Sequence, residues 1–403
     1  MGFNPLKEKG IPLEKQFRNW SELNVEPYEK GSVNPYTRTR IITLNGIEVD
    51  AALSSHQFFR CCDNPEIKAS LALMRRIEQQ QQKVISGLIP AEESTLELTI
   101  GYEQVAVDIT AFIARQEPDP YLKQNFDFGL LEDFDHLYRY ANLLDLVEGK
   151  QAHDITGNYT EIMAGRPTMV EHRHPYDDVR AHYEKHTVDP VSRLHVLTLI
   201  AAEQQTMNFY MNVSNRYSDP IARGLYQEIA MIEEQHVTQY GSLLDPLETM
   251  LQREVFRHYN ECYLYHSFVG QEKDLRIMRI WERHLEMELE HLRVACDLLY
   301  RFEGIEAEEI LPKELPSSLR FEPNKEYVRK VLAEQVDLRS MGPSFLPLTE
   351  LPKNALSIAH QNELNKGGVP SEEVIKEHAQ RKGVTIQFMT EGPHPVEGKK
   401  KQK

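Results

Sequence analysis

Residues 203–236 read EQQTMNFYMNVSNRYSDPIARGLYQEIAMIEEQH, and this stretch decides the fold. It begins with a glutamate, ends with the pair Glu233 and His236, and carries between them Asp219-Pro220, a combination that starts helices. Apolar residues recur at helical spacing on both sides of Asp219, which predicts two helices joined by a short turn. Because positions three apart share one helix face, Glu233 and His236 should project together into an otherwise apolar stripe.

The same hairpin occurs 100 residues earlier in the chain. Between residues 103–145 and 203–245, nine of 43 aligned pairs are identical without a gap. Ordinary residue frequencies would give about three. The matches include the lone glutamate, the turn and the histidine: Glu103 with Glu203, Asp119 with Asp219, and His136 with His236. Where the later copy has Glu233, the earlier one has the shorter Asp133, and the adjacent Glu132 is an alternative carboxylate.

A third hairpin, residues 247–301, fits the same template with a shorter turn. Glu261 is its lone glutamate, and Glu288 and His291 are its Glu-x-x-His pair. The spacing between the lone glutamate and the carboxylate of the pair is 30, 30 and 27 residues in the three hairpins. His284 precedes Glu288 by about one helical turn and adds a second imidazole to this face.

These residue types in this pattern predict a metal site. A carboxylate inside an apolar stripe is costly unless it is paired or metal-bound, and no Lys or Arg recurs on these faces. Two divalent ions would neutralise four carboxylates, and two neutral histidines would complete the ligand shell. Buried Glu–His hydrogen bonds are the alternative, but three copies of the set favour metal. The candidate ligands are Glu103, Asp133, His136, Glu203, Glu233, His236, Glu261, His284, Glu288 and His291.

A Glu on each of two helices and Glu-x-x-His on two others is the ligand set of ferritin-like di-iron and di-manganese proteins. Residues 90–300 resemble that superfamily, which includes rubrerythrins, bacterioferritins and arylamine N-oxygenases. The resemblance implies an all-α, ferritin-like four-helix bundle with an additional helical hairpin, and two transition-metal ions, iron or manganese. It also implies a redox enzyme, an oxidase or oxygenase that activates O2 or peroxide, with a small-molecule substrate and an electron-donor protein. The arylamine N-oxygenases carry an extra histidine similar to His284.

Connection length favours pairing the first two hairpins in one bundle. A ferritin-like bundle needs a crossover that returns along a helix of about 40 Å, which takes at least about 12 extended residues. Residues 148–189 are long enough, whereas only Pro246 separates residue 245 from the third hairpin. This pairing predicts that helix 190–216 runs antiparallel to helix 91–116.

Two other arrangements stay open. The second and third hairpins could share a site, since both carry a true Glu-x-x-His. Alternatively, the third hairpin could have its own site, with Glu261, His284, Glu288 and His291 acting alone or across the twofold axis of a homodimer. A ferroxidase or storage protein, and a non-catalytic helical protein with structural metals, are the alternative functions.

The rest of the chain predicts three regions. Residues 1–62 form an N-terminal arm in which 41–49, with Asn45-Gly46 as the turn, read as a small β-hairpin. Residues 63–302 form the helical domain, with hairpins 91–147, 190–245 and 247–301, and residues 303–403 form a C-terminal extension. A helix is expected at about 65–86, where Glu78 could point into the bundle but is better explained by a solvated helix face.

Composition excludes several partners. The net charge of -16 argues against nucleic acid and anionic membranes, and no run of apolar residues is long enough to span a bilayer. The four cysteines form no C-x-x-C pair, which argues against a rubredoxin or zinc centre and fits a reducing compartment. With no signal peptide at the N-terminus, we expect a cytoplasmic protein, most simply a homodimer.

Overall fold

The computed structural model describes residues 2–383 and 392–396, so part of the predicted C-terminal extension lies outside the described residues. The described chain is mostly helical, with thirteen α-helices and one two-stranded antiparallel sheet. The all-α prediction is therefore confirmed. None of the described helices combines the length and the apolar character needed to cross a bilayer.

Eight long helices form the body of the molecule, and each begins at a side-chain cap. Ser94 and Thr249 make capping boxes, and an Asn or Asp caps each of the other six, usually with Pro in the first turn. The helices are α2 (Pro35–Cys61), α3 (Pro65–Ser86), α4 (Thr95–Gln116), α5 (Pro120–Glu148), α7 (Pro190–Val213), α8 (Pro220–Gly241), α9 (Met250–Val269) and α10 (Leu275–Glu303).

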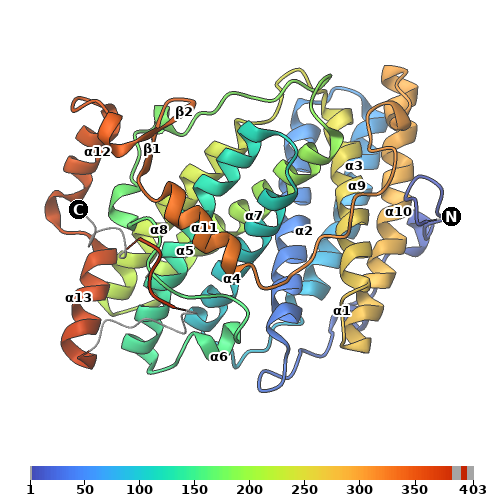
Figure 1. Ribbon diagram of the computed structural model, residues 1–403. Helices are drawn as coiled ribbons and strands as arrows, with labels where there is room; N and C mark the ends of the chain where they lie inside the picture. Colours follow the sequence, from blue (N-terminus) through green and yellow to red (C-terminus); the bar gives the residue numbers. More distant parts are fainter. Residues whose placement is uncertain (1, 384–391, 397–403) are drawn as a thin grey trace.

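These helices form four hairpins that assemble into two units of four helices (Figure 1). We call α4, α5, α7 and α8 the central unit, and α2, α3, α9 and α10 the outer unit. In the central unit α4 packs on α7 and α5 on α8; in the outer unit α2 packs on α9 and α3 on α10. The units meet where α2 packs against α4 and α7, and where α7 packs against α9.

The pairing in the central unit is the one that connection length predicted. Tyr210 of α7 donates to Glu103 of α4, and Ser192, near the start of α7, donates to Glu117 just beyond the end of α4. The two helices are therefore antiparallel, and residues 149–189 form the crossover. It contains α6 (His153–Thr156) and two short 3-10 turns, Thr168–Val170 and Pro175–Asp177.

The outer unit joins distant parts of the chain. Its first hairpin ends at Ser86 and its second begins at Met250, so the whole central unit is inserted between them. The third hairpin of the sequence thus has a partner hairpin within the same chain. Neither the pairing of the second and third hairpins nor a third hairpin acting alone describes the structure.

Two further segments pack on the eight-helix body. The N-terminal segment contains the 3-10 turn Leu13–Lys15 and α1 (Trp20–Leu23), and it lies along α3 and α10. The C-terminal segment contains α11 (Lys325–Gln335), β1 (Leu338–Met341), β2 (Ser344–Pro347), α12 (Leu356–Leu364) and α13 (Pro370–Lys382). Of these, α13 packs on α5 and α8 of the central unit, at the left of Figure 1.

The β-hairpin predicted at residues 41–49 is wrong, because these residues lie inside α2. Gly46 is not a turn residue but the point of closest approach to α7. A Cβ at Gly46 would lie 2.5 Å from Nε2 of Gln205 and 3.1 Å from the carbonyl oxygen of Ala201. The Gln205 side chain fills this space and donates to the carbonyl of Ile42 at 2.8 Å. The glycine thus allows the two units to pack closely.

We expect Gly46→Ala to destabilise the protein by about 1–3 kcal/mol, because the methyl group overpacks the contact with α7. Urea unfolding would measure this change. Gly241→Ala is the matched control, since no atom lies within 4 Å of a Cβ at that helical position. Equal stability of the two variants would contradict the packing role of Gly46.

Candidate metal centre

Six of the predicted ligands meet in the middle of the central unit, and we call them the central cluster. Helices α4 and α7 each supply one glutamate, and α5 and α8 each supply a carboxylate and a histidine. All six side chains are at most 1% exposed. The members of the central cluster are Glu103, Asp133, His136, Glu203, Glu233 and His236.

Glu233 lies between the two histidines of the central cluster. Its Oε1 is 3.1 Å from Nδ1 of His136, and its Oε2 is 3.2 Å from Nδ1 of His236. Nδ1 of His236 also lies 3.3 Å from Asp133 and 3.7 Å from Glu203. Both imidazoles thus turn the same ring nitrogen inwards, towards a shared carboxylate.

The ligand atoms form two overlapping groups, each within 4.8 Å. One contains atoms of Glu103, His136 and Glu233; the other contains atoms of Asp133, Glu203, Glu233 and His236. Glu233 belongs to both, so this carboxylate could bridge two cations. On the far side of the first group, Tyr210 donates a 2.5 Å hydrogen bond to Glu103 and holds that carboxylate in place.

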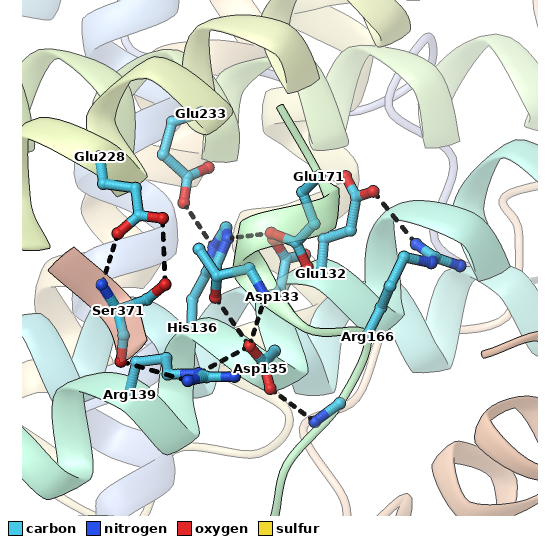
Figure 2. Close-up of polar contacts among 12 residues, drawn as sticks. Glu132, Asp133, Asp135, His136, Arg139, Arg166, Glu171, Glu228, Glu233 and Ser371 are labelled. Carbon is cyan, nitrogen blue, oxygen red and sulfur yellow. Dashed lines mark hydrogen bonds and ion pairs between the residues drawn. The ribbon is translucent and has the colours of Figure 1, made fainter. Parts of the chain in front are cut away.

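The outward nitrogen of each histidine meets a further buried carboxylate. Nε2 of His136 lies 3.0 Å from Glu171, which the crossover supplies (Figure 2). Nε2 of His236 lies 2.8 Å from Glu132, which Arg166 and Arg173 neutralise at 3.1 and 2.6 Å. Partners of this kind fix which nitrogen carries the proton and leave Nδ1 free to ligate. Glu132 therefore orients His236 and does not replace Asp133.

Burial and crowding shift the acidity of the cluster. Burial raises the pKa of Glu103 to about 8 and that of Glu203 to about 7, and it raises the pKa of Asp133, which also faces Glu203. Burial acts in the same direction on Glu233, but hydrogen bonds from His136 and His236 outweigh it and lower its pKa to about 2. The positive charges of the protein alone therefore do not balance the negative charge of these buried carboxylates.

Several cluster oxygens have no hydrogen-bond partner. They are Oε2 of Glu103, both carboxylate oxygens of Asp133 and both of Glu203. Among the residues that the structure describes, no Lys or Arg forms an ion pair with any carboxylate of the central cluster. Buried, unpaired carboxylate oxygens are costly, whereas bound cations would satisfy them. Each of the two groups of ligand atoms could hold a metal ion.

The remaining predicted ligands, Glu261, His284, Glu288 and His291, lie in the outer unit. Glu261, Glu288 and His291 occupy positions equivalent to Glu203, Glu233 and His236, and all are fully buried. His284 is also buried, but its Nδ1 lies 3.1 Å from the hydroxyl of Tyr265. It belongs to none of the three groups of close ligand atoms in the two units.

Sequence reasoning missed the partners of these residues on the N-terminal hairpin. Glu48 of α2 takes the position of Glu103, while Glu78 and Gln81 of α3 take those of Asp133 and His136. Gln81 donates to Glu288 at 2.8 Å. The prediction that Glu78 lies on a solvated face is wrong, because its side chain is only 1% exposed and faces His258 of α9 at 3.8 Å.

Two regularities in the sequence could have found the N-terminal hairpin. Glu48 and Glu78 are 30 residues apart, the spacing of the first two hairpins. In addition, an Asn or Asp helix cap stands 14 residues before six of the eight lone or paired carboxylates of the two units. These pairs are Asn34 and Glu48, Asn64 and Glu78, Asp119 and Asp133, Asp189 and Glu203, Asp219 and Glu233, and Asp274 and Glu288.

Comparison with protein-family models, with curated proteins and with solved structures gave no match for this chain.

We expect His136→Ala and His236→Ala to lose equal amounts of bound metal, about half or more of the central cluster's content, because the two side chains occupy equivalent positions. Elemental analysis after anaerobic reloading would measure it. His195→Ala is the matched control. His195 is also buried and paired with a carboxylate, Glu117 at 2.7 Å, but lies outside the cluster. Equal metal loss in all three variants would mean that misfolding, not ligation, is responsible.

The metal-free protein should lose stability as pH rises from about 5 to about 8. Glu103 and Glu203 have folded-state pKa values of about 8 and about 7, above those of an unfolded chain. The native state therefore binds more protons in this window, and raising the pH removes that advantage. Thermal unfolding at several pH values would measure the trend. Glu103→Gln should flatten it, and a metal-free stability that rises with pH would contradict it.

Proposed function

We propose that the central unit is a ferritin-like bundle that binds two transition-metal ions, iron or manganese, and that the chain is a redox enzyme that activates O2 or peroxide. The observation that carries this proposal is the position of Glu233, whose two oxygens each face the inward nitrogen of one histidine. A carboxylate shared in this way suits a pair of ions, one on each side. Glu103 and His136 would complete one site, and Asp133, Glu203 and His236 the other.

The donor set supports redox-active metals. Carboxylates and imidazoles together suit iron and manganese, and the four carboxylates would balance the charge of two divalent ions. When bound, such ions supply the one-electron steps that reaction with O2 or peroxide requires. The protein contributes a dry site, since every ligand is buried, and fixed histidine orientations through Glu171 and Glu132.

The surroundings of the cluster support reaction with a small molecule. A cavity of about 110 Å³ is lined by Glu132, Arg166, Arg173 and apolar side chains that include Phe128 and Val170. Because Glu132 contacts His236 directly, the cavity comes within one side chain of the cluster. Tyr210 lies on the opposite side, hydrogen-bonded to Glu103 and packed against Tyr140 and Tyr226. With redox-active ions bound at the cluster, this buried phenol would be near enough to exchange an electron with them.

Anaerobic loading with Fe(II), followed by rapid mixing with O2, tests the proposal. We expect the metal bound to the central cluster to be oxidised, with a transient or charge-transfer absorption band. The His136→Ala/His236→Ala double variant should show no such band. Uptake of many irons per chain would indicate a storage protein instead. A spectroscopically silent metal whose removal by chelator lowers the unfolding temperature would indicate a structural role, and either result would reject the enzyme.

A further inference from the structure

The outer unit carries a second cluster built on the same four-helix plan as the central one. Glu48, Glu78, Glu261, Glu288 and His291 occupy the equivalent carboxylate and histidine positions, and each is at most 1% exposed. Two differences separate the clusters. Gln81 stands where the central unit has His136, and α9 contributes an additional imidazole, His258, one turn before Glu261.

In the Glu48 half of this second cluster, the protein's own hydrogen bonds take up one carboxylate oxygen of Glu48. Tyr265 donates to Oε1 of Glu48 at 2.5 Å. The amide of Gln81 donates to the same oxygen at 3.4 Å and to Oε1 of Glu288 at 2.8 Å. Through its Nε2 the Gln81 amide is a donor here, where the imidazole of His136 offers a ligand nitrogen in the central cluster. This half therefore lacks the histidine ligand of the central cluster, although Oε2 of Glu48, like Oε2 of Glu103, has no hydrogen-bond partner.

The other half has the opposite character. Neither carboxylate oxygen of Glu78 has a hydrogen-bond partner, although the side chain is buried. Nδ1 of His258 lies 2.8 Å from Glu261, 3.2 Å from Glu288 and 3.8 Å from Glu78. Nδ1 of His291 lies 3.1 Å from Glu288. One ligand atom from each of these four residues lies within 4.8 Å of the others.

The N-terminal segment fixes the orientation of His291. Oε1 of Gln16 lies 2.8 Å from Nε2 of His291, and the Gln16 amide donates to the carbonyl of Ile11 at 2.7 Å. With its Nε2 proton accepted by Gln16, His291 presents the lone pair of Nδ1 to Glu288 and Glu78. Gln16 is 1% exposed, so the segment also covers the cluster.

We propose that the outer unit binds a single divalent transition-metal ion through Glu78, His258, Glu288 and His291. Two imidazoles and two carboxylates form a neutral site with one divalent ion and suit four-coordinate binding. The ion would link α3 to the hairpin of α9 and α10. Along the chain, α3 is connected to this hairpin only through the inserted central unit. The two units of the chain therefore hold different sites, one for two ions and one for a single ion.

Elemental analysis of the manganese- or iron-reloaded full chain tests this assignment. We expect about three ions in the wild-type protein. His258→Ala and Glu78→Gln should each lose one ion and keep two, whereas Glu48→Gln should keep all three because Glu48 is not a ligand. The two ions that remain in the central cluster, together with an unchanged circular-dichroism spectrum, would show that these variants fold.

Two results would overturn the assignment. A wild-type content of two ions, all lost in the His136→Ala/His236→Ala double variant, would leave the outer unit without metal. Loss of metal in Glu48→Gln equal to that in Glu78→Gln would make the second cluster a two-ion site. Neither result depends on reactivity with O2, so this assignment and the proposed redox function can fail separately.

Discussion

The structure depends on the burial of like charges: each four-helix unit encloses four carboxylates among apolar side chains. An ionised carboxylate taken out of water costs several kcal/mol or more unless an opposite charge meets it. In the central cluster two imidazoles meet this charge only in part, which is why burial keeps the pKa values of Glu103 and Glu203 near neutrality. The helices, the oriented histidines and the crossover are arranged around this unbalanced charge.

The surroundings of each cluster follow from that constraint. In the central unit, the crossover brings Glu171 to His136, and Arg166 and Arg173 to Glu132. The irregular segment thus serves as more than a connection, since Glu171 orients His136 directly and the two arginines hold Glu132, which orients His236. In the outer unit the N-terminal segment does the same for His291 through Gln16. In both units, an irregular segment outside the four helices fixes the orientation of an imidazole that faces a glutamate of the cluster.

Much of this arrangement could be predicted from the sequence, because the carboxylates and histidines stand at helical spacing within repeats. The repeat predicted which helices pair in the central unit, and the length of residues 148–189 predicted their antiparallel order. Local composition misled at α2, where Asn45-Gly46 between apolar residues resembles a β-turn. Gly46 is selected by the tight contact with Gln205, a tertiary effect that no local pattern reveals.

The second cluster was harder to predict for a chemical reason. With Gln81 in place of histidine, α3 lacks the Glu-x-x-His motif, and a run of glutamines indicates a solvated surface. The burial of Glu78 and Gln81 depends on α10, more than 200 residues further along the chain. The contacts by which Glu171 orients His136 and Gln16 orients His291 could not be predicted from the sequence either, since Glu171 and Gln16 lie in irregular segments without periodicity.

The insertion of the central unit within the outer one sets an order of assembly during synthesis. Residues 95–241 contain every helix of the central unit, so this unit can fold as soon as they have emerged, whereas α2 and α3 must wait for α9 and α10. Until then, the N-terminal hairpin has one neighbour available, because α2 packs on α4 and α7. The central unit is therefore the part of the eight-helix body that the chain completes before the last long hairpin can close the outer unit.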